Sequence, residues 1–229
     1  MSKRCAIVIG STGLVGRALL EQLVACQQYQ QIYSVSRRPL ATAYASVTEI
    51  VVPDFAELSQ ALGALELRGA DAFSTLGTTQ KQAGSKERFR AIDYGYNLSF
   101  AEECQTQGVK HYLLLSATGA KPNSRIFYNR VKGELERSVA LLGFEQISLF
   151  QPSLLMGEHQ DSRLGEGLAQ RAFKIVKPIV PENWDYRPIE AARVAAAMLH
   201  IAIESPIVED NPHVYSNRDM LELTLEREE

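Results

Sequence analysis

The sequence is poor in cysteine and has no excess of positive charge. Its 229 residues include three cysteines, Cys5, Cys26 and Cys104, which are far apart and form no CxxC or metal-ligand spacing. Scattered thiols in odd number argue against a disulfide framework and predict a reduced, cytoplasmic protein. A formal net charge of −3 supplies no broad positive field for nucleic acid or for an acidic membrane surface, so neither is expected as a partner.

Long apolar runs are also missing. The apolar stretch after Arg4 is too short for the core of a signal peptide and ends in glycines. The best later stretch, residues 194–203, falls short of membrane-spanning length. The hydrophobic fraction of 45% is nevertheless ample for a folded core. With no internal repeat or linker to divide the chain, we expect one domain over residues 1–229.

Short apolar segments alternate with segments of helical periodicity, a pattern typical of βαβ units. The fold class is therefore predicted as α/β, a Rossmann-type doubly wound parallel sheet. The strands are expected at 4–9, 31–36, 48–52, 70–76, 111–116 and 147–150, and the helices at 14–26, from 58 through 65, at about 87–107, 128–142 and 189–203. A closing segment near 214–223 is expected to return to the core. Residues 157–188 break this rhythm and predict a small insertion over the carboxyl edge of the sheet.

A glycine-rich loop separates the first predicted strand from the first predicted helix. Gly10 allows a tight turn, Gly13 lets the backbone approach a pyrophosphate, and Gly16 lets the helix pack close to the sheet. The free N–H groups of the helix start then face the phosphates. The alternative is a plain turn, but the strand before and the helix after favour a dinucleotide site. Its expected contacts are Gly10, Ser11, Thr12, Gly13, Leu14, Val15 and Gly16.

The end of the second predicted strand indicates which dinucleotide is bound. An acid that would bind the ribose 2′-hydroxyl of NAD is absent, and Arg37 and Arg38 stand there instead. Two guanidinium groups can hold a 2′-phosphate, which favours NADP(H) over NAD(H). The alternative is a solvated arginine pair. Asp54, at the end of the third strand, could border the adenine or could simply cap the following helix, and the sequence leaves both open.

Three residues suggest carbonyl reduction. Tyr128 and Lys132 are four apart on a predicted helix and share one face, and Ser116 ends the fifth strand, at the edge where ligands bind in such folds. A nearby ammonium favours the ionised form of a phenol, so Tyr128 could serve as the acid, Lys132 could also bind the nicotinamide ribose, and Ser116 could hold the substrate oxygen. The alternative is an exposed helix pair without chemistry.

These motifs resemble the short-chain dehydrogenase/reductase superfamily in its extended or atypical branch. Several stretches are more narrowly similar to the Tat-interacting-protein oxidoreductases, which are NADPH-binding atypical members. The stretches are 76–79, Asp93, Lys110-His111, 131–134, Gln151-Pro152 and 162–166. The resemblance implies that the cofactor is lined by Leu76, Gly77 and Thr78 and that the nicotinamide passes Pro152, Ser153 and Leu154.

One position departs from the pattern of the superfamily. Asp93 stands where typical members have an asparagine that takes part in a proton relay, so the relay is in question. The leading hypothesis is an NADPH-dependent reductase of a small carbonyl compound whose identity the sequence does not indicate. The main alternative is a noncatalytic NADPH-binding sensor that acts through a protein partner, and an epimerase or isomerase is a third.

Other polar residues give weaker signals. The four histidines, His111, His159, His200 and His213, show no metal spacing, so no metal is predicted. Arg163, Glu166 and Trp184 in the expected insertion could contact substrate or could form a salt bridge and an anchor, and the sequence leaves both open.

Overall fold

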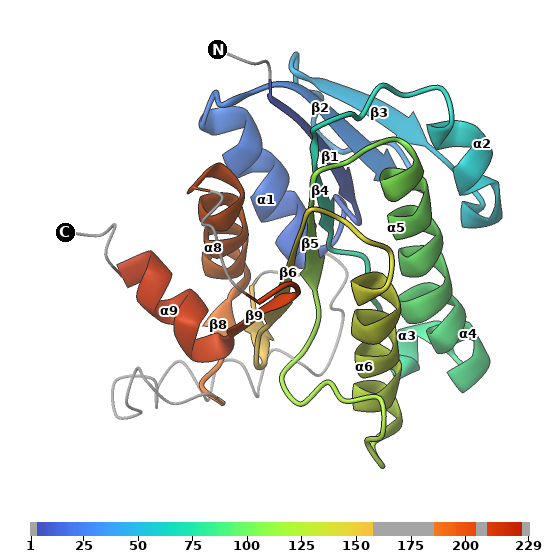
Figure 1. Ribbon diagram of the computed structural model, residues 1–229, viewed down its shortest axis with the longest axis vertical. Coiled ribbons are helices and arrows are strands. Elements are labelled where there is room, and N and C mark those ends of the chain that lie inside the picture. The colour runs from blue at the N-terminus through green and yellow to red at the C-terminus, as the bar shows by residue number, and fades with distance from the viewer. Residues whose placement is uncertain (1–3, 158–185, 205–209, 226–229) are drawn as a thin grey trace.

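Seven parallel strands form the centre of the molecule (Figure 1). The computed structural model describes residues 4–157, 186–204 and 210–225. The strand order is β3-β2-β1-β4-β5-β6-β9. Strands β2 and β3 are therefore added on one side of β1, and β4 and the later strands are added on the other side. The strands are β1 (Arg4–Ile9), β2 (Tyr29–Ser36), β3 (Val47–Val51), β4 (Asp71–Ser74), β5 (His111–Leu115), β6 (Gln146–Gln151) and β9 (His213–Ser216). A separate pair joins β7 (Leu155–Met156) to β8 (Ile189–Glu190).

Helices cover both faces of the sheet. On one face α1 packs against α8, and on the other lie α2, α5 and α6 (Figure 1). The helices are α1 (Leu14–Ala25), α2 (Leu58–Leu62), α3 (Gln80–Ala83), α4 (Lys86–Arg90), α5 (Asn97–Thr106), α6 (Phe127–Ala140), α8 (Ala191–Glu204) and α9 (Asn217–Leu225), with a 3-10 turn η1 (Phe55–Glu57) and a π-helical turn η2 (Ala91–Tyr96).

The core forms two layers because the strands are buried on both faces. Alternate residues of β1 belong to different layers. Ala6 and Val8 pack with α1 and α8, whereas Ile7 and Ile9 pack on the other face, with α2, α5 and α6. This period of two places successive side chains on opposite sides of the sheet. Cys104 is fully buried in the second layer, as its helical position predicts.

The doubly wound parallel sheet is confirmed, and most elements lie where the sequence places them. The differences are local. β2 begins at Tyr29, two residues before the expected start, and α2 ends at Leu62, so Leu65 lies outside it. The expected helix at 189–203 begins with strand β8. The short helix α3 was not predicted, although its Thr79–Gln82 capping box is a readable start signal.

The long helix expected over residues 87–107 is interrupted. It consists of α4, the wide turn η2 and α5, and it ends before Gly108, whose φ of +76° is left-handed. The π-helical turn contains Asp93, and Asn97 begins the next segment. Such turns occur often at functional sites, and both side chains belong to the site described below.

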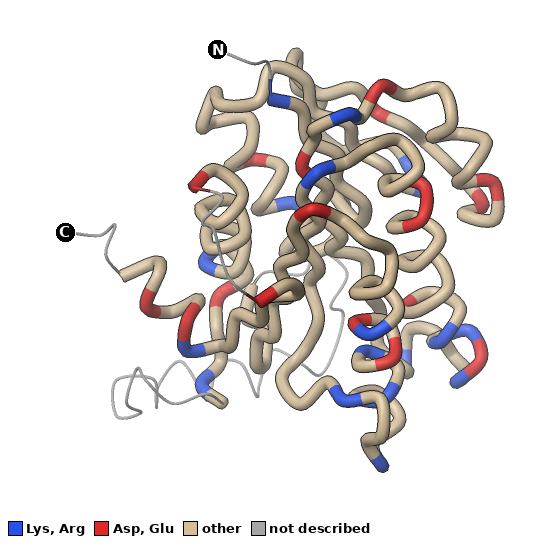
Figure 2. The backbone as a smooth tube through the Cα atoms, in the orientation of Figure 1, with Lys and Arg blue, Asp and Glu red and all other residues tan. Residues whose placement is uncertain are grey.

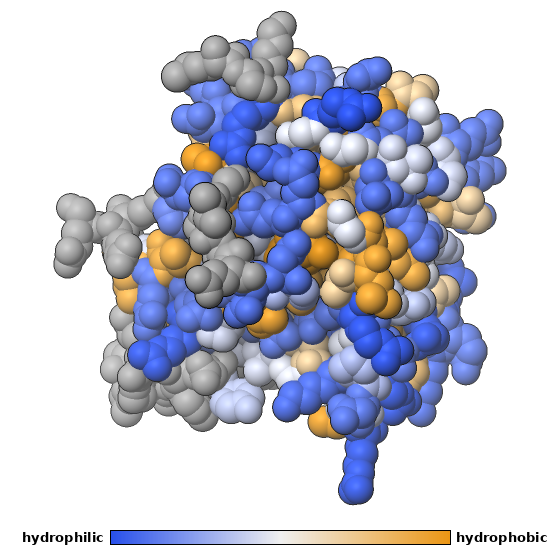
Figure 3. All heavy atoms as spheres, viewed as in Figure 1, coloured by the Kyte–Doolittle hydropathy of each residue, from blue (hydrophilic) through white to orange (hydrophobic). Residues whose placement is uncertain are grey.

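The expected insertion at 157–188 lies mostly outside the described residues. Arg163, Glu166, Trp184 and His159 all fall there, so their alternatives stay open. In the described part, Lys and Arg are interspersed with Asp and Glu (Figure 2), and hydrophilic side chains cover most of the face seen in Figure 3. None of the helices in the described ranges is long and apolar enough to cross a membrane.

Candidate functional site

The glycine loop is shaped by close packing at two of its three glycines. Gly10 has a φ of +81°, and a Cβ there would lie 2.6 Å from the backbone nitrogen of Leu76. A Cβ at Gly16 would overlap the carbonyl oxygen of Gly10 and lie 2.6 Å from Oγ1 of Thr75. Both positions therefore require glycine for the protein's own packing, between β1, α1 and the end of β4.

Gly13 is different, because packing within the protein opposes a side chain there only weakly. A Cβ there would meet only the Gly10 carbonyl oxygen, at 3.1 Å. Gly13 is exposed, is the N-cap of α1 and makes no side-chain cap, so the helix start is open to a ligand. An exposed glycine before uncapped helix N–H groups is the arrangement that a phosphate needs.

The arginine pair lies at the same edge of the sheet as the glycine loop. Ser11 of the loop is hydrogen-bonded to Ser34 of β2, with 2.7 Å between the two hydroxyl oxygens. Arg37 and Arg38 follow the end of β2 and are exposed. Ser36 Oγ donates to the carbonyl oxygen of Arg38 at 2.5 Å, which fixes the backbone of this turn and leaves both guanidinium groups outside it.

Asp54 acts as a helix cap. Its Oδ1 accepts a hydrogen bond from the backbone N–H of Ala56 at 3.0 Å, at the start of η1. The next side chain, Phe55, is buried and packs edge-on against Tyr96, at 5.5 Å between ring centroids. The capping alternative from the sequence is thus present in the structure, and a contact with adenine remains a proposal.

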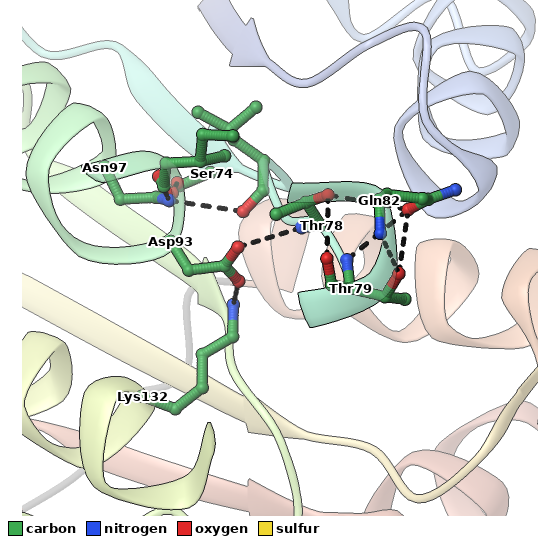
Figure 4. A network of polar contacts seen from close by, with 9 residues as sticks. Ser74, Thr78, Thr79, Gln82, Asp93, Asn97 and Lys132 are labelled. Atoms are coloured by element: carbon green, nitrogen blue, oxygen red, sulfur yellow. Dashed lines mark hydrogen bonds and ion pairs between the residues drawn. The ribbon is translucent and has the colours of Figure 1, made fainter. Parts of the chain in front are cut away.

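The loop after β4 is fastened to the interrupted helix (Figure 4). Asn97 accepts from Ser74 Oγ at 2.5 Å and donates from Nδ2 to the carbonyl oxygen of Leu76 at 3.2 Å. Asp93 Oδ2 accepts from the backbone N–H of Thr78 at 2.9 Å. Residues 76–78, which the sequence places along the cofactor, are therefore held at both ends by η2 and α5.

Lys132 and Asp93 form a buried ion pair. Lys132 Nζ lies 2.8 Å from Asp93 Oδ1, and the two side chains are 5% and 1% exposed. Burial acts to lower the pKa of Lys132. The negative charge of Asp93, with smaller effects from Tyr128 and Glu136, acts in the opposite direction and outweighs burial, so the pKa of Lys132 is raised. Lys132 is therefore an ammonium at physiological pH, and it points at the loop containing Gly77 (Figure 4).

Tyr128 lies one turn before Lys132 at the start of α6. Its ring is half-buried and packs against Phe89 of α4, with 5.6 Å between centroids. The phenol is close enough to Lys132 to act on its pKa electrostatically. The predicted sharing of one helix face by this pair is thus seen, with Lys132 facing inward and Tyr128 nearer the surface.

Ser116 lies at the end of β5, but its hydroxyl faces the interior. Its Oγ is fully buried and has no hydrogen-bond partner among the described residues, although the hydroxyl is near enough to Glu136 to act on the pKa of that carboxyl. Gln151 at the end of β6 donates to the same carboxylate, at 2.9 and 3.2 Å from its two oxygens. Burial raises the pKa of Glu136, and the nearby Ser116 hydroxyl, the hydrogen bond from Gln151 and the charge of Lys132 oppose this rise. Glu136 was not among the predicted site residues, although its spacing of four from Lys132 on α6 is a usable signal.

The segment after β6 passes over the glycine loop. Ser153 N–H donates to Asn217 Oδ1 at 2.9 Å, and Leu154 is 60% exposed. Pro152 is buried, and its carbonyl oxygen accepts from the N–H of Thr118 at 2.9 Å. A Cβ at Gly157 would lie 2.6 Å from Leu14 of α1. Residues 152–157 therefore run from the end of β6 to the start of α1, along the carboxyl edge of the sheet.

The histidines support no metal site in the described part of the chain, where no group of three metal-binding side chains occurs. His111 is buried, and its Nε2 lies 2.8 Å from Ser148 Oγ. Burial, aided by Arg4 and Lys110, lowers the pKa of His111 to about 3, so this side chain is neutral. His111 begins β5 and thus lies at the amino end of the sheet, away from the site.

Comparison with known proteins identifies relatives of this chain. No protein-family model matches the chain. It is 32% identical over 212 residues to "Protein FMP52, mitochondrial" of Debaryomyces hansenii, covering 91% of this chain and 92% of that one. It is 35% identical over 188 residues to "Protein HTATIP2" of Rattus norvegicus, covering 80% and 74%.

Solved structures share the fold at low sequence identity. MoeE5 in complex with UDP-glucose and NAD has a TM-score of 0.65 and 16% identity, over 97% of this chain and 81% of that one. The UDP-glucose 4-epimerase of Thermotoga maritima has a TM-score of 0.64 and 14% identity, over 95% of this chain and 80% of that one. The oxidoreductase ylbE of Lactococcus lactis has a TM-score of 0.60 and 18% identity, over 97% of both chains. These likenesses show that the chain shares the fold of these proteins.

One prediction is overturned. The expectation of a cytoplasmic protein is wrong by this comparison, because relatives from Debaryomyces hansenii and Candida glabrata are named as mitochondrial. Scattered cysteines indicate a reducing environment but do not specify a compartment. The expected resemblance to the extended or atypical short-chain dehydrogenases/reductases is confirmed: the chain belongs to the family of the FMP52 and HTATIP2 proteins.

Proposed function

We propose that this chain is an NADP(H)-dependent oxidoreductase that reduces a small carbonyl compound. The observation that carries the proposal is the position of Lys132. Its buried ammonium points at residues 76–78, and Tyr128 lies one helical turn away, nearer the surface. A cation beside a dinucleotide loop, with a phenol next to it, is the arrangement that proton transfer to a carbonyl oxygen requires.

The residues present fit a dinucleotide along the carboxyl edge, at the point where the strand order reverses. The open start of α1 behind Gly13 would hold the pyrophosphate, and Arg37 and Arg38 would hold a 2′-phosphate, which favours NADP(H) over NAD(H). Asp54 would border the adenine while it caps η1. The remaining proposed contacts are Ser11, Thr12, Leu14, Val15, Leu76, Gly77, Thr78, Lys132, Pro152, Ser153 and Leu154.

The bound cofactor supplies a hydride to the carbonyl carbon. In this proposal Tyr128 donates its phenolic proton to the carbonyl oxygen as the negative charge develops there. Lys132 holds the ribose and stabilises the tyrosine after it has lost the proton. Ser116, whose buried hydroxyl has no hydrogen-bond partner in the described part of the chain, would orient the carbonyl.

The position of Ser116 favours a second candidate. The hydroxyl of Ser116 is fully buried and not exposed to substrate, and a chain that binds NADPH without turning it over would need no exposed hydroxyl here. This candidate is a noncatalytic NADPH-binding sensor whose bound cofactor alters its association with a protein partner. It shares the proposed cofactor site and differs only in the chemistry at Tyr128.

A cofactor-oxidation screen separates the two candidates. The purified chain would be mixed with NADPH and with panels of aldehydes, ketones and quinones, and absorbance at the reduced-nicotinamide band would be followed. The reductase proposal predicts enzyme-dependent oxidation with at least one carbonyl class. Tight NADPH binding without oxidation in any panel, together with a protein partner whose capture depends on NADPH, would favour the sensor.

A further inference from the structure

We infer that Asp93 sets the relative affinity of this chain for oxidised and reduced nicotinamide cofactor by neutralising Lys132. The inference rests on the cofactor site proposed above and adds a function for a residue to which that proposal gives none. Asp93 is a positioning residue, since its carboxylate acts through Lys132 and through the backbone of residue 78.

The geometry leaves Asp93 little freedom. One carboxylate oxygen lies 2.8 Å from Lys132 Nζ, and the other accepts the Thr78 N–H at 2.9 Å. The residue is fully buried in the π-helical turn η2, and Figure 4 shows its carboxylate between Lys132 and the loop that contains Thr78. A charge pair buried at this depth is weakly screened by water and salt, so its net charge acts on a neighbouring ligand.

The pair lies directly against the proposed cofactor wall. A Cβ on Gly77 would meet Asp93 Oδ1 at 3.4 Å and Lys132 Nζ at 3.7 Å. Gly77 itself is exposed, so only its backbone separates the ion pair from the surface along which the dinucleotide would lie. A charge on the nicotinamide ring would be within electrostatic reach of both partners.

Within the described ranges, the remaining groups around Lys132 add no positive charge. α6 contributes the phenol of Tyr128 and the carboxyl of Glu136, η2 contributes Asp93, and the β4 loop contributes only backbone and the Thr78 hydroxyl. At the end of α4, Arg90 is paired with Glu134 of α6 and lies over the ring of Tyr94. The groups that act on Lys132 therefore leave the site neutral or slightly negative.

Charge balance distinguishes the two cofactor forms. The oxidised nicotinamide ring carries one positive charge and the reduced ring carries none, whereas the rest of the dinucleotide is the same in both. An uncompensated ammonium at position 132 would repel only the oxidised ring. Asp93 removes this repulsion, so the chain binds oxidised cofactor more tightly, relative to reduced cofactor, than it would with Lys132 alone.

Titration of both cofactor forms tests the inference. NADP⁺ and NADPH would be titrated by calorimetry into the parent and into Asp93→Asn, which keeps the shape and removes the charge. We expect the ratio of the two dissociation constants, oxidised over reduced, to rise on the order of tenfold in the variant. The control is Glu134→Gln, which removes a carboxylate from α6, the helix that carries Lys132. Glu134 pairs with Arg90 and not with Lys132, so this variant should leave the ratio unchanged.

A second pair of variants covers a failure of Asp93→Asn to fold. Lys132→Met leaves Asp93 without its cation, and Asp93→Asn/Lys132→Met removes both charges. The single variant should favour the oxidised form more than the double variant does, and the double variant should have a ratio near that of the parent.

The outcomes separate this inference from the proposed function. Equal weakening of NADP⁺ and NADPH in Asp93→Asn, or equal ratios in the two Lys132→Met proteins, would show a purely structural role and overturn the inference while the cofactor site stands. If the parent binds neither NADP(H) nor NAD(H), the proposed function fails first and the inference falls with it.

Discussion

The ammonium of Lys132 and the carboxylate of Asp93 are 2.8 Å apart in the interior, joining α6 to a π-helical turn far away in the sequence. This contact fixes the lysine against the loop after β4. It also places a structural constraint on the site, because a buried charge whose partner is removed must either find water or lose its charge.

The first prediction concerns the stability of this ion pair. Lys132→Met should lower the free energy of unfolding by about 3–5 kcal/mol, since it leaves Asp93 buried without its cation. Asp93→Asn/Lys132→Met, which leaves no unpaired charge, should recover part of the loss. Urea denaturation of the parent and both variants measures this. Additive losses, with the double variant the least stable, would show that the two charges do not stabilise each other.

A second prediction concerns the exposed arginines after β2. Arg37→Ala should weaken NADPH binding by roughly 10–100-fold, because a charge-assisted hydrogen bond contributes about 1.5–3 kcal/mol, and should leave NADH nearly unaffected. Arg68→Ala is the matched control, since Arg68 is equally exposed but precedes β4 at the amino end of the sheet. If the parent binds NADH as tightly as NADPH in calorimetric titration, the arginine assignment is wrong.

Gly13 provides a third prediction, because its backbone suits any residue. Its φ is −75°, and an added Cβ meets only one oxygen, at 3.1 Å. Gly13→Val should therefore fold, by circular dichroism, yet lose dinucleotide binding, since the side chain fills the phosphate approach. Gly63→Val is a matched control with the same 3.1 Å clearance and a φ of −60° at the end of α2. Retained cofactor affinity in a folded Gly13→Val protein would rule out the loop as a phosphate site.

The acid stability of the protein should depend on His111. Because the pKa of His111 falls from 6.5 to about 3 in the folded chain, the unfolded state binds the proton more readily at mildly acidic pH. Stability from this group is complete above pH 6.5 and is lost as the pH falls toward 3, amounting to about 2 kcal/mol between pH 7 and pH 5. His111→Gln should flatten this slope in denaturation measured across that range. Parallel pH curves for parent and variant would contradict the assignment.

Much of the fold could be predicted because its signals are local. Gly10 and Gly16 stand between an apolar run and a helical period, and the alternation of such segments is enough to predict the parallel sheet. The Thr79–Gln82 capping box was equally local and could have been used. In contrast, nothing in residues 91–96 distinguishes a π-helical turn from regular helix, because that choice depends on the contacts of Asp93 and Asn97 with the β4 loop.

Site residues could be grouped from the sequence only where residues with suitable chemistry are also close together along one predicted element. Tyr128 and Lys132 share a helix face, and this spacing was sufficient to group them. The residues that contact this helix come from elsewhere in the sequence. Asp93 lies in the π-helical turn η2, and Gln151, which donates to Glu136, ends β6. Ser116 shows the limit most clearly, because the end of a strand predicts an edge position but not which way the hydroxyl turns.

The central claim is that Tyr128 performs proton transfer on a carbonyl next to bound NADPH. Tyr128→Phe removes only the phenolic oxygen, and the ring can still pack against Phe89. The direct measurement compares NADPH affinity and steady-state NADPH oxidation in parent and variant, with a carbonyl substrate from the screen. We predict NADPH binding within a few-fold of the parent and a fall of at least about 100-fold in both kcat and kcat/KM, since the proton is needed in the transition state. Carbonyl reduction that survives in Tyr128→Phe at a rate near that of the parent would contradict the mechanism, even with the fold and cofactor site intact.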